Sequence, residues 1–317
     1  MKQAVISAVF LSAMGLAGQV NAADANLTIG GELEVEMNAD TISTPTASIN
    51  FNKQFNDRSN ADVVLLYEDG ITAIDSAAIN IAPTGEPWSM SIGYIYLPFG
   101  GFDTSMATDP VTLSLGETRE SAISYNYSVS NLSSSIYLFD GSNNVAGKSV
   151  LDNFGFKLTH ASALMKTSFT YIDDIGDSNA LQTAINTQLG NNDTSGKVPG
   201  QSVSFSLAMG AFNFDTELTS AVKAFQAGQV DVAAVQPSGT NTELSYHFQM
   251  AGNKSILALG AQSTRDASVL GLPRSRLMLA LNSNLQADTH LILQASQDTD
   301  YASVVTSNYV IKLVAEF

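Results

Sequence analysis

The sequence predicts an all-β fold, a transmembrane antiparallel β-barrel of about sixteen strands. Three observations lead to this prediction. In the last nine residues, an apolar face that ends on the aromatic Phe317 lies opposite a face that carries Lys312 and Glu316. Along the chain, short turns and longer loops alternate between segments of about 9–11 residues, the length of a tilted membrane strand. Charged residues make up only 14% of the chain, compared with about 25% in ordinary soluble domains.

The first residues predict a secretory signal peptide, residues 1–22, that is cleaved. Lys2 gives a short basic start, residues 4–18 are apolar and small, and Ala22 ends a small-x-small cleavage site. This stretch is too short to cross a membrane as a helix. Residues 23–317 are then expected to form the barrel alone. The first candidate strand follows so closely that no separate plug domain fits before it.

The charge balance excludes several other classes of protein. The chain carries 30 acidic and 14 basic side chains, a net charge of −16, and no cysteine. Loss of Lys2 would leave 30 acids against 13 bases, or −17. Nucleic-acid binding needs clustered Lys and Arg, so no nucleic-acid partner is expected. The lack of cysteine rules out disulfides. A secreted acidic β-solenoid would show a fixed repeat, and the sequence has none.

Turn signals such as residues 56–60 and 83–87 set the strand boundaries. The segments between them are the candidate strands: 27–37, 45–55, 61–69, 73–82, 88–97, 120–128, 132–140, 152–160, 163–172, 201–209, 212–224, 240–250, 254–265, 275–284, 289–298 and 306–317. Their even number suits a closed antiparallel barrel with both ends on one side.

The alternation within these segments predicts one face toward lipid and the other toward a lumen. Val203, Phe205 and Leu207, for example, alternate with Ser204 and Ser206. A soluble sandwich with one wet face would show the same pattern. Loop lengths decide between the two. The even-numbered connections are all short and the odd-numbered ones mostly long, as expected for periplasmic turns and outer loops. The cell outer membrane is therefore the expected location.

Tyrosines are candidates for the aromatic belts at the two membrane interfaces, although plain strand packing is the favoured explanation for any one of them. The candidates are Tyr94, Tyr96, Tyr125, Tyr127, Tyr246 and Tyr309.

The third outer connection, residues 98–119, is too apolar for a loop in water. One interpretation folds it into the lumen, where Asp103, Asp109 and Glu117 would narrow the pore. Arg119 is the fourth candidate for this constriction, and it would pair with an acid and hold the loop's return to the next strand. The other interpretation makes the loop a structural lid over the barrel mouth. The acidity of the chain predicts cation preference in any open channel.

Part of this segment resembles the signature block of the LbtU-type siderophore porins, relatives of the legiobactin receptor. The resemblance rests on Leu97-Pro98-Phe99-Gly100, Asp109-Pro110 and residues 115–122. It is dense over about 26 residues and weaker over the rest of the chain. The resemblance implies an outer-membrane barrel that imports ferric siderophore without a plug. Some members of that family carry a helical amino-terminal extension, which this chain lacks. No ligand-binding residues can be transferred from the family.

Catalytic and metal chemistry are weakly supported, so we expect neither an enzyme nor a cofactor. The three histidines, His160, His247 and His290, are isolated in different strands, and the last two are predicted to face the lumen. A nucleophilic serine needs a histidine base with an orienting partner. Asp173-Asp174 with Asp177 forms a candidate calcium site on a long outer loop, although no EF-hand spacing is present. Residues 179–189 show a short helical pattern.

The function expected from these observations is import of ferric siderophore or a similar small solute through the lumen. A general diffusion porin is the alternative, and a non-transporting structural or adhesive barrel comes third. The expected partners are the lipid bilayer, lipopolysaccharide and the barrel-assembly machinery, which would read Phe317. The sequence does not indicate an oligomeric state.

Overall fold

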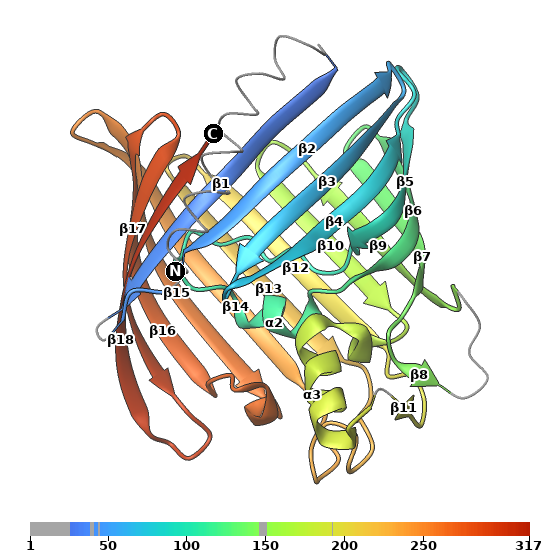
Figure 1. Cartoon of the computed structure of the whole chain (residues 1–317). Helices are drawn as coiled ribbons and strands as arrows, with labels where there is room; N and C mark the ends of the chain where they lie inside the picture. The colour runs from blue at the N-terminus through green and yellow to red at the C-terminus, as the bar shows by residue number, and fades with distance from the viewer. Residues whose placement is uncertain (1–25, 39–40, 44, 146–150, 192) are drawn as a thin grey trace.

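A computed structural model describes residues 26–38, 41–43, 45–145, 151–191 and 193–317. The predicted signal peptide, residues 1–22, lies outside the described residues. Sixteen antiparallel strands close into one barrel, and β1 pairs with β18 to complete it (Figure 1). Apart from that closure and two places where a short extra strand intervenes, each strand pairs with its neighbours in sequence.

The wall strands agree closely with the sixteen predicted segments. They are β1 (Leu27–Asn38), β2 (Thr46–Asn56), β3 (Ser59–Glu68), β4 (Ile71–Ile81), β5 (Trp88–Tyr96), β6 (Arg119–Val129), β7 (Leu132–Asp140), β9 (Asn153–Ala161), β10 (Met165–Ile172), β12 (Gly200–Met209), β13 (Phe212–Ala221), β14 (Ser238–Met250), β15 (Asn253–Arg265), β16 (Ser275–Gln286), β17 (Thr289–Thr299) and β18 (Val305–Glu316).

The alternation of side chains separates the two faces of the wall as the sequence predicts. Ile123 and Tyr125 point outward from β6, while Ser124 between them is buried on the inner side. The register carries each face across neighbouring strands, because Tyr125 lies opposite Met90 on β5 and Ile136 on β7. Apolar side chains therefore form a continuous outer band.

Phe317 completes the seam between the two terminal strands. Its backbone N–H donates to the carbonyl of Gly31, and its own carbonyl accepts from the N–H of Gly31, both at 3.0 Å. A Cβ on Gly31 would lie 2.4 Å from the Phe317 ring, so only glycine leaves room for the ring there. The terminal aromatic thus has a packing role in addition to the assembly role predicted for it.

Short elements occupy the loop end of the barrel. They are α2 (Val111–Gly116), η1 (Ile175–Asp177), α3 (Asn179–Leu189), η2 (Ser268–Leu270), and the two-stranded parallel pair β8 (Asn144–Val145) and β11 (Asp193–Thr194). The helix α3 coincides with the predicted helical stretch. Its Leu181 and Ile185 are fully buried in an apolar cluster with Phe139 and Ile172 of the wall. Among the described residues, no helix has the length and apolar character needed to cross a membrane.

Candidate functional site

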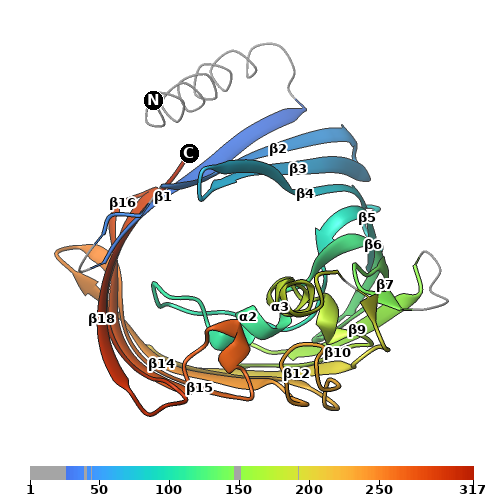
Figure 2. The same cartoon turned by 60° about the horizontal axis from the view of Figure 1, so that its bottom comes forward.

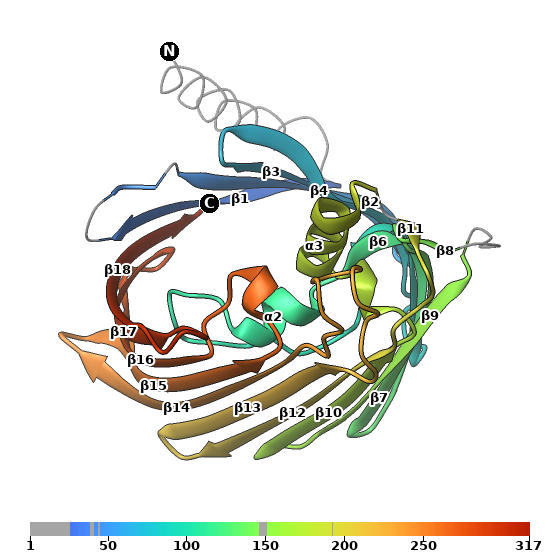
Figure 3. The same ribbon diagram turned by 90° about the horizontal axis from the view of Figure 1, so that it is seen from below.

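The loop between β5 and β6 runs inside the barrel. It leaves the wall at Leu97 and returns at Thr118, and the Leu97 N–H donates to the Thr118 carbonyl at 2.9 Å to close its base. Figures 2 and 3 show the loop and α2 lying toward β12–β15 rather than across β1–β4. This arrangement agrees with the inserted loop of the sequence analysis rather than with a lid. We call residues 98–118 the lumen loop.

Glu217 on β13 is the strongest single anchor of the lumen loop. Its carboxylate accepts the backbone N–H groups of Gly101 at 2.7 Å and Phe102 at 3.0 Å. The Thr112 hydroxyl, at the start of α2, donates to it at 3.0 Å. From the wall, the Ser202 hydroxyl donates at 2.7 Å. Four donors satisfy a carboxylate that is 6% exposed, and this compensates for its removal from water.

Two further wall strands hold the loop in the same manner. Glu243 on β14 accepts the Thr104 hydroxyl at 2.8 Å and the Ser105 N–H at 3.1 Å. Farther round the barrel, Gln294 on β17 accepts the Ala107 N–H at 2.9 Å. The loop therefore follows the inner wall across several strands. Its backbone donors, which no helix or sheet satisfies, find side-chain acceptors instead.

At its beginning the loop is attached to β9 and β10. The Lys157 ammonium donates to the Gly100 carbonyl at 2.7 Å, and the Gly100 N–H donates to the Thr170 hydroxyl at 3.2 Å. Lys166 pairs with Asp103 at 3.3 Å. The Asp103 side chain keeps 69% of its surface exposed, so this surface ion pair adds little to the anchoring.

The apolar side chains of the loop pack into spaces that glycines leave in the wall. Met106 lies against β15 at Gly260, where an added Cβ would come within 2.7 Å of its terminal methyl group. Leu115 of α2 is fully buried, and a Cβ on Gly239 of β14 would lie 2.7 Å from it. Small residues on the inner wall thus let the loop approach closely.

The three predicted acids of the loop occupy different environments. Asp103 and Asp109 are exposed inside the barrel. Glu117 is half-buried and accepts the amide of Asn179, at the start of α3, at 2.8 Å. Glu117 therefore joins the lumen loop to α3. That these acids narrow the pore remains a prediction.

Arg119 requires a correction, because it does not face the lumen. Its neighbour Glu120 points inward and accepts bonds from Ser142, so Arg119 lies on the opposite face, over the outward rings of Tyr94 and Tyr96 at about 5.5 Å. It forms an ion pair with Asp75 of β4. The predicted pairing with an acid is confirmed, but Arg119 belongs to the outer rim and not to the constriction.

The opposite wall, β1–β4, carries polar side chains toward the lumen. Asp62 on β3 accepts amide groups from Asn60 at 2.9 Å and Asn80 at 2.6 Å, and also pairs with Asn52. The Ser91 hydroxyl on β5 extends this network by donating to Asn80 at 2.7 Å.

At the seam, Lys312 and Glu34 form an inward ion pair at 2.8 Å. Lys312 lies opposite Ile292 on β17 and therefore shares the face of the loop anchor Gln294.

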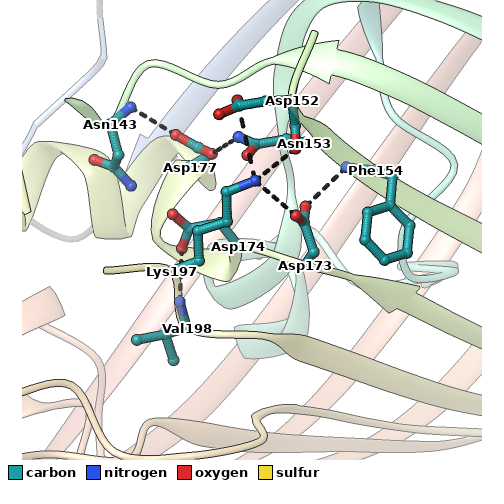
Figure 4. Close-up of polar contacts among 9 residues, drawn as sticks. All are labelled: Asn143, Asp152, Asn153, Phe154, Asp173, Asp174, Asp177, Lys197 and Val198. Atoms are coloured by element: carbon teal, nitrogen blue, oxygen red, sulfur yellow. Dashed lines mark hydrogen bonds and ion pairs between the residues drawn. The ribbon is translucent and has the colours of Figure 1, made fainter. Parts of the chain in front are cut away.

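The candidate calcium site is a structural cluster instead (Figure 4). Asp177 accepts the Asn143 N–H and the Asn153 amide, each at 2.8 Å. Asp173 accepts the Phe154 N–H at 2.8 Å and pairs with Lys197 at 2.8 Å. Each acid is turned to its own donors. In the described part of the chain, no three His, Asp or Glu side chains gather as metal ligands.

Asp174 of the same cluster is almost fully buried. Its carboxylate accepts the N–H groups of Gly176 at 3.0 Å and Val198 at 3.2 Å. Burial raises the pKa of Asp174 to about 6 in spite of these bonds. The cluster fixes η1 and α3 over one side of the barrel mouth.

The three histidines lie on both faces of the wall. His160 lies in β9 on the outward face, opposite Leu132. His247 and His290 line a cavity on the inner wall, in agreement with their predicted faces.

Sequence reasoning missed the anchors Glu217, Glu243 and Gln294. All three occupy inward positions of their strands, which was a usable signal, but an inward acid reads equally well as lining an open pore.

Comparisons with known proteins agree with this architecture. No family model matches the chain. A UPF0422 protein of Coxiella burnetii is 30% identical over 227 residues, 68% of this chain and 48% of that protein. A UPF0422 protein of Legionella pneumophila strain Paris is 22% identical over 239 residues, 70% of this chain and 45% of that protein. The chain spans about half the length of the curated relatives it matches.

Solved structures share the fold at low sequence identity. The outer-membrane channel DcaP of Acinetobacter baumannii superposes with a TM-score of 0.61 at 14% identity, over 92% of this chain and 96% of that chain. OmpF of Salmonella typhi, in complex with daunomycin, gives 0.64 at 10% identity, over 92% and 97%. An anion-selective porin of Comamonas acidovorans gives 0.58 at 11%, over 92% and 99%. The chain is therefore a porin-like barrel of the outer membrane, with relatives among the UPF0422 proteins of Coxiella and Legionella.

Proposed function

We propose that this protein is a diffusion channel for small hydrophilic solutes, neutral or cationic, and that the lumen loop sets its size limit. The observation that carries the proposal is the anchoring of this loop along the inner wall by Glu217, Glu243 and Gln294. Solute would pass between the loop and the inward faces of β1–β4. Both sides of this path are rigid, because buried charge-assisted bonds hold the lumen loop and the closed barrel holds β1–β4.

The charges on both sides of this path favour cations. Asp103 and Asp109 are exposed on the loop, and the inward positions of β1 and β3 contribute further acids, including Glu32 and Asp62. Low-dielectric walls focus the field of such groups inside a pore. The fold alone does not set this preference, because an anion-selective porin shares it.

Import of ferric siderophore follows only from the resemblance noted in the sequence, and it forms the alternative outcome of the test. The helix α3 stands over part of the mouth, and Glu117 joins it to the lumen loop. This support favours small solutes over a bulky iron complex.

The test uses purified protein in planar bilayers and in liposomes. We expect cation-selective reversal potentials in a salt gradient, and entry of small sugars with a sharp upper size limit. Entry of a ferric siderophore faster than a sugar of equal mass would favour the siderophore function. An absence of conductance from protein shown to be folded would overturn the channel proposal.

A further inference from the structure

We infer that a cavity on the inner wall, near the short turns of β14–β15 and β16–β17, binds an oxyanion, that is, a phosphate or carboxylate group of a small solute. The cavity has a volume of about 340 Å³, within the range of small-molecule sites. Its inward polar lining is His247, Lys254, Asn282, Asn284 and His290, with Ile256 beside them. The proposal goes beyond the channel function, on which it rests only for the route by which solute arrives.

The register brings these side chains together from four strands. His247 lies opposite Ile256 on β15, and Ile256 lies opposite Asn282 on β16. One step nearer the turns, Asn284 lies opposite His290 on β17. Side chains two residues apart on a strand share a face, so Lys254 joins Ile256. Two of the chain's three histidines therefore meet at one place.

The charge of the cavity lining is opposite in sign to the net charge of the chain. Acids outnumber bases by 30 to 14 in the whole sequence, yet no Asp or Glu lines this cavity within the described residues. Lys254 supplies a full positive charge, and the two asparagine amides and two imidazoles supply N–H donors. The only permanent charge in the lining is positive, which suits an anion with several acceptor oxygens.

One hydrogen bond bears on which ring nitrogen of His247 carries the proton. The Asn213 amide nitrogen lies 3.0 Å from Nε2 of His247. When this amide donates, Nε2 is the acceptor and the proton of the neutral ring resides on Nδ1. In that tautomer the neutral ring keeps its Nδ1–H as a hydrogen-bond donor.

The nearest acids belong to the seam: Glu32 interacts electrostatically with His290, and Glu34 lies on the same face of β1. Glu34 binds Lys312 at 2.8 Å, which leaves less of its charge to repel an anion at His290. The contrast along the pore is therefore between an acidic path beside the lumen loop and a donor-rich cavity below it. A solute that carries both an amine and a carboxylate would interact with the acidic path through its amine and with the cavity through its carboxylate.

The test measures binding directly, on the folded protein in detergent. Inorganic phosphate is followed by its phosphorus NMR line width, and citrate competes with it as the carboxylate probe. The variant carries His247→Gln, Lys254→Gln and His290→Gln. Lys223→Gln removes one positive charge at the opposite end of the barrel and serves as the control. Both variants must keep heat-modifiable mobility on gels.

We expect phosphate to bind the parent and the control equally, and the triple variant at least about tenfold more weakly, since each charge-assisted bond lost is worth a factor of this order. Citrate should displace phosphate. Equal binding by the triple variant, or no binding by the parent, would overturn the site. Because binding is read without conduction, failure here leaves the channel proposal standing, and a closed channel leaves this test valid.

Discussion

The two halves of the barrel wall carry similar inward polar side chains and use them differently. On β13, β14 and β17, inward carboxylates and an amide bind the lumen loop, as Glu217, Glu243 and Gln294 show. On β1–β5, the same residue types bond to each other across strands, as Asp62 does with Asn60 and Asn80. The first set of strands binds the lumen loop, whereas the second set faces the path that we propose for solute.

The difference teaches that an inward acid can have opposite consequences for transport. Where a loop supplies backbone N–H groups, a buried carboxylate narrows the pore by holding the loop. Where neighbouring amides supply the donors, the carboxylate stays beside the path and contributes charge to it. The distribution of partners, rather than of acids, separates the two halves.

The largest expected effect comes from releasing the loop. The double variant Glu217→Ala, Glu243→Ala removes acceptors for loop groups from Gly101 to Thr112, each charge-assisted bond being worth about 1.5–3 kcal/mol. Single-channel conductance should rise, and larger neutral sugars should enter liposomes. The matched control is Asp62→Ala on β3, in the wall opposite the lumen loop, which should leave the size limit unchanged. Equal size limits in parent and double variant would show that the loop does not form the constriction.

A pair of glycines compares packing in the two halves. On Gly31, a Cβ would meet the Phe317 ring at 2.4 Å and the Ser48 carbonyl at 2.5 Å, and backbone cannot yield. On Gly260, it would meet the flexible ends of Met106 and Met278. Gly31→Ala should cost about 3 kcal/mol of barrel stability and Gly260→Ala about 1 kcal/mol or less. Urea unfolding in vesicles measures both, and the reverse order would mean that the seam is the more adaptable region.

The strands were predictable because the membrane imposes a period of two over a fixed length, and this pattern survives even in weakly hydrophobic segments. The position of Arg119 was also within reach. Extending the alternation of Ile123 and Tyr125 backward puts residue 119 on the outer face. The bulge that turns Asp75 toward it was not predictable, since one extra residue in β4 leaves no mark on local composition.

The anchors show a limit of a different kind. An inward Glu217 has the same local sequence signal whether it faces water or a loop that is more than a hundred residues away. Only the three-dimensional course of the lumen loop distinguishes the two cases. The loop's apolar content predicted that it would be covered, but not which strands would cover it.

The next prediction concerns η1 and α3, which cover one side of the barrel mouth and which we call the cap. Asp174 lies in the polar cluster that holds them. Its pKa is raised from 3.8 to about 6 by burial. The folded state therefore binds more protons than the unfolded state across that window, and stability falls as pH rises through it, by about 3 kcal/mol at most. Asp174→Asn keeps an oxygen for the Gly176 and Val198 N–H groups and should remove this pH dependence. Hydrogen exchange of residues 173–190, corrected for intrinsic rates, is the measurement.

At pH 7 the Asp174→Asn cap should be the better protected, and near pH 4 the two proteins should match. Asp57→Asn, in a short turn at the other end of the barrel, controls for the change in net charge. A cap less protected in Asp174→Asn at pH 7 would mean that the two backbone donors outweigh the cost of burying the charge.

The smallest expected effect concerns the seam ion pair, which lies where the two halves meet. Glu34 and Lys312 cancel each other at 2.8 Å. Glu34→Gln should leave an uncompensated positive charge beside the path and lower the cation preference, while Lys312→Gln should raise it. A unit charge about 8 Å from the path contributes about 0.5 kcal/mol in water, roughly twofold in permeability ratio. Reversal potentials of the two variants in the same salt gradient should therefore shift in opposite directions from the parent. Shifts of the same sign would show that the charges of this ion pair do not act on ions in the conducting path, and would contradict the proposal that solute passes along β1–β4.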